Sequence, residues 1–122
     1  MNSADIEVGG WQWDLRKDQL EIDDGFRAIL GLAWDSAPRR LEFLCGVIHP
    51  EDLHNFQHAV QRLVDGRQSS LRLCHRMLTR WGECRRVDIF GEVLERAASG
   101  GALRVGGRVV AAARSEPLGI AI

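Results

Sequence analysis

Apolar and polar side chains alternate along the first part of the chain. Trp11, Trp13 and Leu15 are separated by single polar residues, and this period of two predicts a half-buried β-strand. A turn at residues 17–18 and a return strand over residues 19–22 would complete a hairpin. The chain is therefore expected to begin with two antiparallel strands.

The spacing of the apolar residues then changes to that of a helix. Asp23 can cap a short helix in which Phe26, Ile29 and Leu30 fall at positions i, i+3 and i+4. Gly31 follows, and glycine accepts the left-handed backbone that often ends a helix.

Two further helices are expected in the middle of the chain. The first is so apolar that it must be covered on most sides or line a cavity. Its shared face consists of Leu41, Leu44, Cys45 and Ile48. In the second, Pro50 suits a first helical position, and Glu51 and Asp52 are well placed against the positive end of the helix dipole. This second helix has the clearest apolar stripe, formed by Leu53, Phe56, Val60, Leu63 and Val64.

After the last helix the period returns to two. Alternating runs predict strands over residues 71–77, 87–93 and 103–109, with turns at 80–83 and 98–101. Three strands joined by short turns form an antiparallel meander. The predicted fold class is α+β, with one antiparallel sheet and helices packed on one of its faces.

Composition limits the possible classes of function. The chain has 122 residues, enough for one domain, and 45% of them are hydrophobic, as in ordinary globular proteins. Its formal net charge is −1 and its basic residues form no stripe, which argues against nucleic acid as a partner. No apolar run approaches the roughly 20 residues that span a bilayer, and residues 1–5 lack the features of a signal peptide.

The cysteine content agrees with a cytoplasmic domain. Cys45, Cys74 and Cys84 are an odd set in elements that we expect to form the core. We interpret them as reduced thiols, because disulfides are rare in the cytosol. The sequence has no C-x-x-C pair, so we predict no metal site.

Five short motifs occur in order along almost the whole chain. They are Gly10-Trp11-Gln12-Trp13-Asp14-Leu15, Gly25-Phe26-Arg27-Ala28-Ile29-Leu30-Gly31-Leu32, Ile48-His49-Pro50-Glu51-Asp52, His75-Arg76-Met77-Leu78-Thr79-Arg80-Trp81-Gly82-Glu83 and Gly106-Gly107-Arg108-Val109-Val110. Their order and spacing resemble those of a PAS sensory domain (a PAS/PAC sensory box). The W-x-W-D start and the H-P-E-D turn resemble the PAS fold-3 subgroup.

The resemblance implies five strands in the spatial order 2-1-5-4-3, with helices on one face. It also implies a single domain over residues 1–113, followed by a tail or linker over residues 114–122. Two features depart from the family pattern. Ala111-Ala112-Ala113 stands where members often have an aspartate-isoleucine-threonine signature that couples the last strand to an effector, and Arg86 replaces a usual tryptophan. These departures do not change the expected fold, but they leave open how the domain would pass a signal to an effector.

A domain of this family senses or relays a signal and usually catalyses nothing. The resemblance therefore implies a regulatory role in a bacterial signalling protein, with the effector, a histidine kinase or a cyclic-di-GMP enzyme, outside this chain. One alternative is a ligand-free module for protein–protein dimerisation, and another is a heme-based sensor. The sequence offers no nucleophile with a partnered base at a persuasive spacing.

The candidate ligand site is the interior between helices and sheet. Gly91 and Gly107 remove side-chain volume from the inward sheet face, and a small apolar cavity there would suit a small ligand. The alternative is a fully packed core without a ligand. The predicted pocket residues are Leu30, Leu44, Cys45, Ile48, Leu73, His75, Ile89, Gly91 and Val105. Of these, His75 is expected more as a core residue with satisfied hydrogen bonds than as a ligand contact.

Two other sets of residues are candidates for function. His54 and His58 lie four residues apart on one helix face, in the region that supplies the axial histidine of heme-binding PAS domains. Solvated histidines without a cofactor are the simpler interpretation. Flavin photochemistry is not expected, because the asparagine-cysteine-arginine-phenylalanine motif of light-sensing relatives is absent. On the outward sheet face, the candidate contacts of a homodimer are Leu78, Phe90 and Val110.

Overall fold

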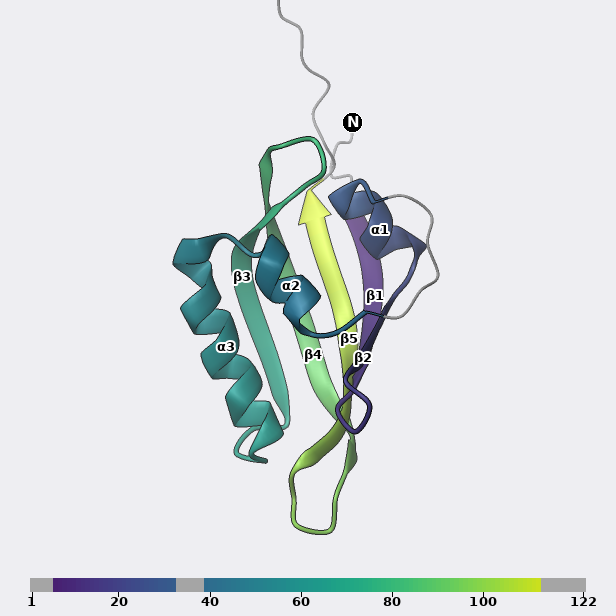
Figure 1. The fold of residues 1–122 in the computed structure, drawn as a ribbon, viewed down its shortest axis with the longest axis vertical. Helices are drawn as coiled ribbons and strands as arrows, with labels where there is room; N and C mark the ends of the chain where they lie inside the picture. Colours follow the sequence, from purple (N-terminus) through teal and green to yellow (C-terminus); the bar gives the residue numbers. More distant parts are fainter. Residues whose placement is uncertain (1–5, 33–38, 113–122) are drawn as a thin grey trace, which may run out of the picture.

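The computed structural model describes residues 6–32 and 39–112, so residues 33–38 and the tail expected over residues 114–122 lie outside the described residues. The described elements are β1 (Ile6–Asp14), β2 (Gln19–Ile22), α1 (Asp24–Leu30), α2 (Glu42–Val47), α3 (Pro50–Val64), β3 (Ser70–Leu78), β4 (Cys84–Arg96) and β5 (Ala102–Ala112). These strands form one antiparallel sheet in the order β2-β1-β5-β4-β3, which confirms the predicted order. The helices lie on one face of the sheet, as predicted (Figure 1).

The helix boundaries follow from local capping. The Asp23 carboxylate accepts a hydrogen bond from the Phe26 N–H at 2.9 Å, and Gly31 ends α1 with a φ of 73°, as the sequence predicts. At the start of α3, His49 Nδ1 accepts the Glu51 N–H at 3.1 Å. The ring of His49 therefore caps the start of α3 by binding local backbone.

Strand β1 begins earlier than predicted. It starts at Ile6 because its pairing with β5 extends back to Ala112, whereas the apolar alternation becomes visible only at Trp11. Gly9 interrupts that alternation for a steric reason. A Cβ atom on Gly9 would lie 2.3 Å from the Phe26 backbone nitrogen, so this position must be glycine for α1 to pack directly against β1.

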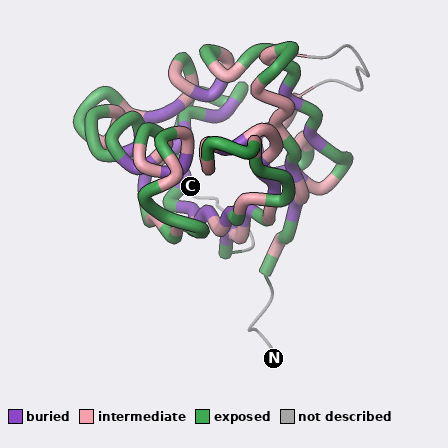
Figure 2. The backbone as a smooth tube through the Cα atoms, turned by 90° about the horizontal axis from the view of Figure 1, so that it is seen from below, coloured by how far each residue is buried: buried purple, intermediate pink, exposed green. Residues whose placement is uncertain are grey.

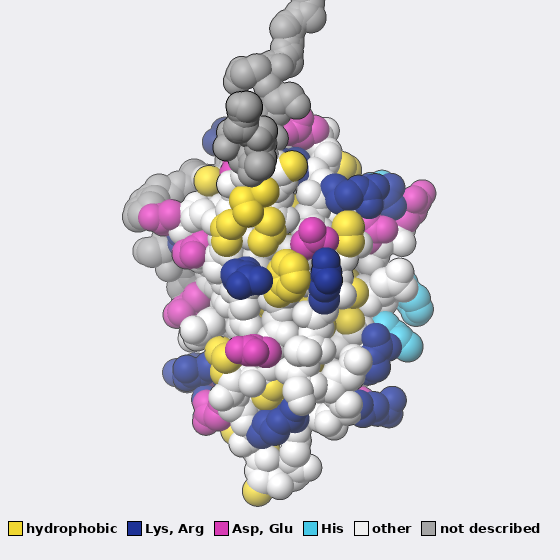
Figure 3. Space-filling model, turned by 180° about the vertical axis from the view of Figure 1, so that it is seen from behind, with side chains coloured by type: hydrophobic (Ala, Val, Ile, Leu, Met, Phe, Trp, Pro, Cys, Tyr) yellow, Lys and Arg dark blue, Asp and Glu magenta, His cyan; other side chains and the backbone are white. Residues whose placement is uncertain are grey.

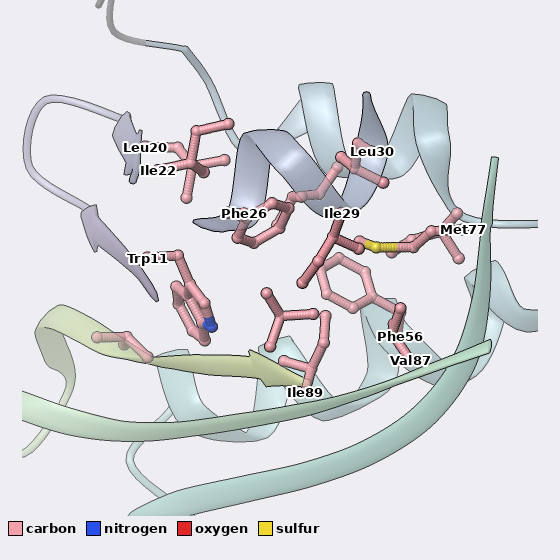
Figure 4. Packing of buried hydrophobic residues seen from close by; sticks show 14 of the residues in the cluster. Trp11, Leu20, Ile22, Phe26, Ile29, Leu30, Phe56, Met77, Val87 and Ile89 are labelled. Carbon is pink, nitrogen blue, oxygen red and sulfur yellow. The ribbon is translucent and has the colours of Figure 1, made fainter. Parts of the chain in front are cut away.

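The core lies between the sheet and the helices. Figure 2 shows buried segments of both layers around the interior, and Figure 4 shows Phe26 and Ile29 of α1 beside Trp11 and Ile89 of the sheet. Phe26 and Ile29 are fully buried. Burial of a side chain of this size stabilises a fold by about 1.5–3 kcal/mol.

The H-P-E-D turn fastens α3 to the free edge of β3. The Asp52 carboxylate accepts hydrogen bonds from the backbone N–H of Arg76 at 2.9 Å and from its guanidinium at 3.0 Å, and Glu51 also contacts this guanidinium at 3.1 Å. The hydrogen bonds from Arg76 hold the pKa of the Asp52 carboxyl well below its usual value. The turn thus places the first residues of α3 against the edge of the sheet.

Candidate functional site

The interior pocket is apolar and very small. Its free volume is about 20 Å³, roughly the room for one water molecule. It is lined by Trp11, Trp13, Phe26, Leu41, Leu44, Phe56, Val60, Leu63, Leu71, Ile89 and Val105. The structure is therefore that of a domain with a nearly filled interior.

The structure brings only part of the predicted pocket set together. Leu44, Ile89 and Val105 line the pocket. Leu30, Ile48 and His75 are buried elsewhere in the core, and Cys45 and Leu73 are half-buried against it. The predicted pocket set lacks four aromatic residues that line the pocket in the structure, namely Trp11, Trp13, Phe26 and Phe56. Their place on inward strand and helix faces was the available signal.

Trp11 occupies the space next to Gly91, whereas the backbone of β4 occupies the space next to Gly107, where a Cβ atom would lie 1.9 Å from the Phe90 carbonyl oxygen. Trp11, Gly107 and Gly91 are neighbours across β1, β5 and β4, and a Cβ atom on Gly91 would lie 2.8 Å from the Trp11 indole. The indole Nε1 donates to the Arg108 carbonyl at 3.3 Å. The protein's own atoms thus fill the volume beside both glycines, which corrects the expectation that they leave room for a ligand and agrees with the alternative of a packed core.

His75 is a buried imidazole without a polar partner. Its side chain faces inward as predicted and is 3% exposed, and neither ring nitrogen has a hydrogen bond to any residue that the structure describes. The ring meets Phe56 edge-on, with centroids 5.8 Å apart. The expectation of satisfied hydrogen bonds is therefore wrong. Burial lowers the pKa of His75, so the neutral form is favoured.

His54 and His58 lie apart from the pocket. Both are exposed on α3, with their rings stacked at a centroid distance of 5.5 Å. The Arg62 guanidinium lies 3.0 Å from His58 Nδ1. Neither imidazole lines the interior pocket, so this geometry does not present an axial ligand to a heme held there.

The cysteine thiols are free, but two of them are not in the core. Cys74 and Cys84 are exposed, because they lie on the outward face of the sheet, and only Cys45 is half-buried. Burial raises the pKa of the Cys45 thiol, which keeps it protonated. Among the described residues, no group of three or more histidine, cysteine or acidic side chains could hold a metal ion.

The outward face of the sheet carries exposed apolar side chains. Leu78, Phe90 and Val110 lie on it as predicted, and Ile6 and Val8 join them from β1. Figure 3 shows apolar side chains gathered on this face among basic ones. Leu78 and Val8 are each 47% exposed and Ile6 is 61% exposed.

Phe90 is the centre of this face. The guanidinium groups of Arg72 and Arg108 lie over its ring at 5.4 and 5.0 Å from the centroid. The two cations come from the strands on either side of β4, and the ring is half-buried between them. We call the set of Ile6, Val8, Leu78, Phe90 and Val110 the sheet-face patch.

A buried arginine connects three elements at one end of the sheet. The Arg85 guanidinium donates to the Glu7 carboxylate and to the Ile29 carbonyl, each at 2.9 Å, and to the Ala112 carbonyl. It therefore links the start of β1, the last turn of α1 and the end of β5. The sequence pattern does not predict this role, because Arg85 is followed by Arg86 and both look like ordinary charged residues of a strand.

A single antiparallel sheet in this order, with helices on one face, defines the class as an α+β domain. Residues 19–109 match the family model described as PAS fold, which is well over half of the chain. The chain therefore belongs to the PAS family, as the motifs indicated.

Solved structures support the same fold. A sensory box histidine kinase/response regulator from Burkholderia thailandensis matches with a TM-score of 0.71 at 22% identity, over 84% of this chain and 75% of that one. The N-terminal domain of a diguanylate cyclase with PAS/PAC sensor from Marinobacter aquaeolei has a TM-score of 0.70 at 21% identity, over 84% and 92%. The domain of a putative light and redox sensing histidine kinase from Haloarcula marismortui has a TM-score of 0.67 at 24% identity, over 84% and 86%.

No curated protein matches the sequence. Within residues 6–32 and 39–112, no helix is long and apolar enough to cross a membrane.

Proposed function

We propose that this PAS sensory domain is the relay module of a cytoplasmic bacterial signalling protein. Its effector, a histidine kinase or a cyclic-di-GMP enzyme, would lie outside this chain. The support is structural similarity to a sensory box histidine kinase/response regulator and to the N-terminal domain of a diguanylate cyclase with PAS/PAC sensor. The free thiols agree with a reducing compartment.

The relay acts through a homodimer formed by the sheet-face patch. The observation that carries this proposal is the exposure of several large apolar side chains on one side of the molecule, opposite the helices. Water contact with these side chains is unfavourable, and a second copy of the same face would remove it. A two-fold axis would place the patch of each copy on that of the other.

The Phe90→Asp variant tests the dimer. Asp in place of Phe90 removes the largest apolar side chain of the patch and puts a charged group between Arg72 and Arg108 instead, so less apolar surface is left to pair the two copies and we expect a monomer by light scattering and sedimentation. His54→Asp is the matched control, because it adds the same charge to the exposed face of α3 and should leave the mass unchanged. A Phe90→Asp protein that stays dimeric would remove the patch from the mechanism.

A small ligand in the interior is the second candidate function. It is favoured by the apolar lining of the pocket and by the unpartnered His75, whose ring contacts the pocket residue Phe56. A volume of about 20 Å³ means that any ligand must displace side chains, chiefly the Trp11 indole. Native mass spectrometry of the purified chain tests this, since a retained ligand adds a discrete mass. A bare polypeptide mass would favour the relay without a ligand.

A further inference from the structure

Strand β3 is an edge strand whose backbone groups divide into two sets. Its odd-numbered residues bond to β4, as shown by the flanking pair in which the Val93 N–H donates to the Ser69 carbonyl at 2.8 Å. In an antiparallel ladder the intervening residues point their N–H and C=O groups away from the partner strand. Ser70, Arg72, Cys74 and Arg76 therefore face the free edge.

Only one half of this edge is covered. At Arg76, the N–H donates to the Asp52 carboxylate at 2.9 Å and the carbonyl accepts the His49 N–H at 2.9 Å. For Ser70, Arg72 and Cys74, the described part of the chain provides no such partner. All three residues are exposed. An uncovered run of backbone donors and acceptors is a template for another strand.

A groove runs along the open half. Its volume is about 410 Å³, and it lies between α3 and β3, with Ala59, Arg62 and Gln68 on the helix side. Leu71 and Leu73 line it toward the core, and Arg72 and Phe90 line it toward the outward sheet face. An extended segment in this groove would therefore meet apolar groups on one side and a cation on the other.

The charges around the groove are mostly basic. Arg62 and Arg72 line it, and Arg96 reaches its margin through a hydrogen bond to Ser69 Oγ at 3.0 Å. Glu92 is the acidic residue in the lining. A second copy of β3 would bring Arg72 and Arg62 against the same arginines, so a self-paired edge is disfavoured. An acidic segment is favoured by the same charges.

We propose that the Ser70–Cys74 edge binds an extended acidic segment of a partner protein as a sixth strand. Backbone hydrogen bonds to Ser70, Arg72 and Cys74 would supply affinity. Alternating side chains of the partner would provide specificity, apolar toward Leu71 and Leu73 and acidic toward Arg72. This site shares Phe90 with the sheet-face patch, but its hydrogen-bonding groups lie on the edge of β3, so the proposal does not depend on the dimer.

The test uses a fluorescein-labelled peptide of alternating valine and glutamate, with a valine–lysine peptide of equal length as its control. We expect saturable anisotropy binding of the first and much weaker binding of the second. The peptide should slow amide hydrogen exchange at Arg72 and Cys74, and leave Leu71 and Leu73 unchanged because these already bond to β4. Failure to bind, or protection located elsewhere, overturns the proposal.

A matched pair of variants isolates the backbone contact. Arg72→Ala and Arg72→Pro both remove the guanidinium, but only proline removes the edge-facing N–H, and proline is tolerated on an edge strand. We expect the proline variant to bind about five-fold more weakly than the alanine variant, as for one lost hydrogen bond. If Arg72→Pro does not fold, Ser70→Pro against Ser70→Ala makes the same comparison. Equal affinities in the folded pair would exclude strand addition at this edge.

Discussion

At the scale of single residues, Trp11 determines the state of the interior. Its indole fills the volume next to Gly91, which would otherwise form a cavity. Trp11→Ala is expected to lower the free energy of unfolding by about 3–5 kcal/mol, because it removes buried surface and leaves a void. Urea denaturation measures this loss. Added indole should bind the void and raise the urea midpoint of the variant.

The control for this substitution is Trp81→Ala. Trp81 is 51% exposed in the β3–β4 hairpin, so a smaller loss is expected and added indole should have no effect. If Trp11→Ala is as stable as the wild type, or if indole fails to stabilise it, the tryptophan is not what closes the pocket.

His75 should make stability depend on pH in a narrow window. Burial lowers its pKa in the folded state below 6.5, and the nearby Asp52 carboxylate only partly opposes this shift. Above pH 6.5 both states are neutral at this ring. Below it the unfolded chain binds a proton that the folded chain resists, so the free energy of unfolding falls as the pH falls.

Urea midpoints between pH 7.5 and pH 5 measure the effect. We expect the decline in the wild type to be reduced in His75→Leu, which has no titratable group at this site. His54→Gln serves as the control, because it removes an exposed histidine and should keep the decline. An unchanged slope in His75→Leu would assign the pH dependence to other groups.

At the scale of elements, the Asp52–Arg76 pair decides how α3 meets β3. The pKa of Asp52 is lowered from its usual 3.8, chiefly by hydrogen bonds from Arg76, so the ionised carboxylate stabilises the fold at neutral pH. Asp52→Asn is expected to lower the urea midpoint at pH 7. This difference from the wild type should shrink as the pH falls below 3.8, because the unfolded chain takes up a proton at Asp52 there, whereas Arg76 keeps the folded carboxylate ionised to lower pH.

Glu51→Gln is the comparison for this pair. Glu51 contacts the same guanidinium from a side chain that is 74% exposed, so solvent screens the interaction and a smaller change is expected. If the two variants lose equal stability, the turn does not act through the hydrogen bonds of Asp52.

Helix boundaries that depend only on nearby residues could be predicted from the sequence. Asp23 and Gly31 set the limits of α1 by capping, and Pro50 starts α3, so these boundaries need no knowledge of the rest of the fold. The start of β1 could not be found in this way. Its first residues are strand only because β5 pairs with them. Gly9 breaks the apolar alternation, because a side chain at this position would collide with α1.

At the scale of the whole molecule, the sheet order and the inward faces could be predicted, but the site could not be placed in full. The family resemblance supplied the order, and alternation placed His75 and Ile89 inward. Whether the interior is open depends on the direction of one indole across two neighbouring strands. No periodicity along a single strand contains that information.

Arg85 makes hydrogen bonds to residues that are far away in the sequence. Its buried guanidinium joins α1 to the start of β1 and the end of β5. If α1 moved when the packing of the interior changed, the movement would therefore reach the end of β5. Arg85→Met keeps an unbranched, flexible side chain of apolar atoms and removes every donor. We expect a loss of about 1–3 kcal/mol in the free energy of unfolding, the cost of leaving buried acceptors unpaired.

The more specific result is local. Amide hydrogen exchange at Val110 and Ala112 should accelerate in Arg85→Met beyond what the loss of global stability explains, since the Ala112 carbonyl loses its partner. Arg86→Met is the control, because the neighbouring arginine is exposed on the outward face and its contact is a 3.8 Å approach to Cys74 Sγ. If exchange at the end of β5 follows global stability alone in both variants, then α1 and β5 are coupled through general packing, and Arg85 contributes stability without relaying position.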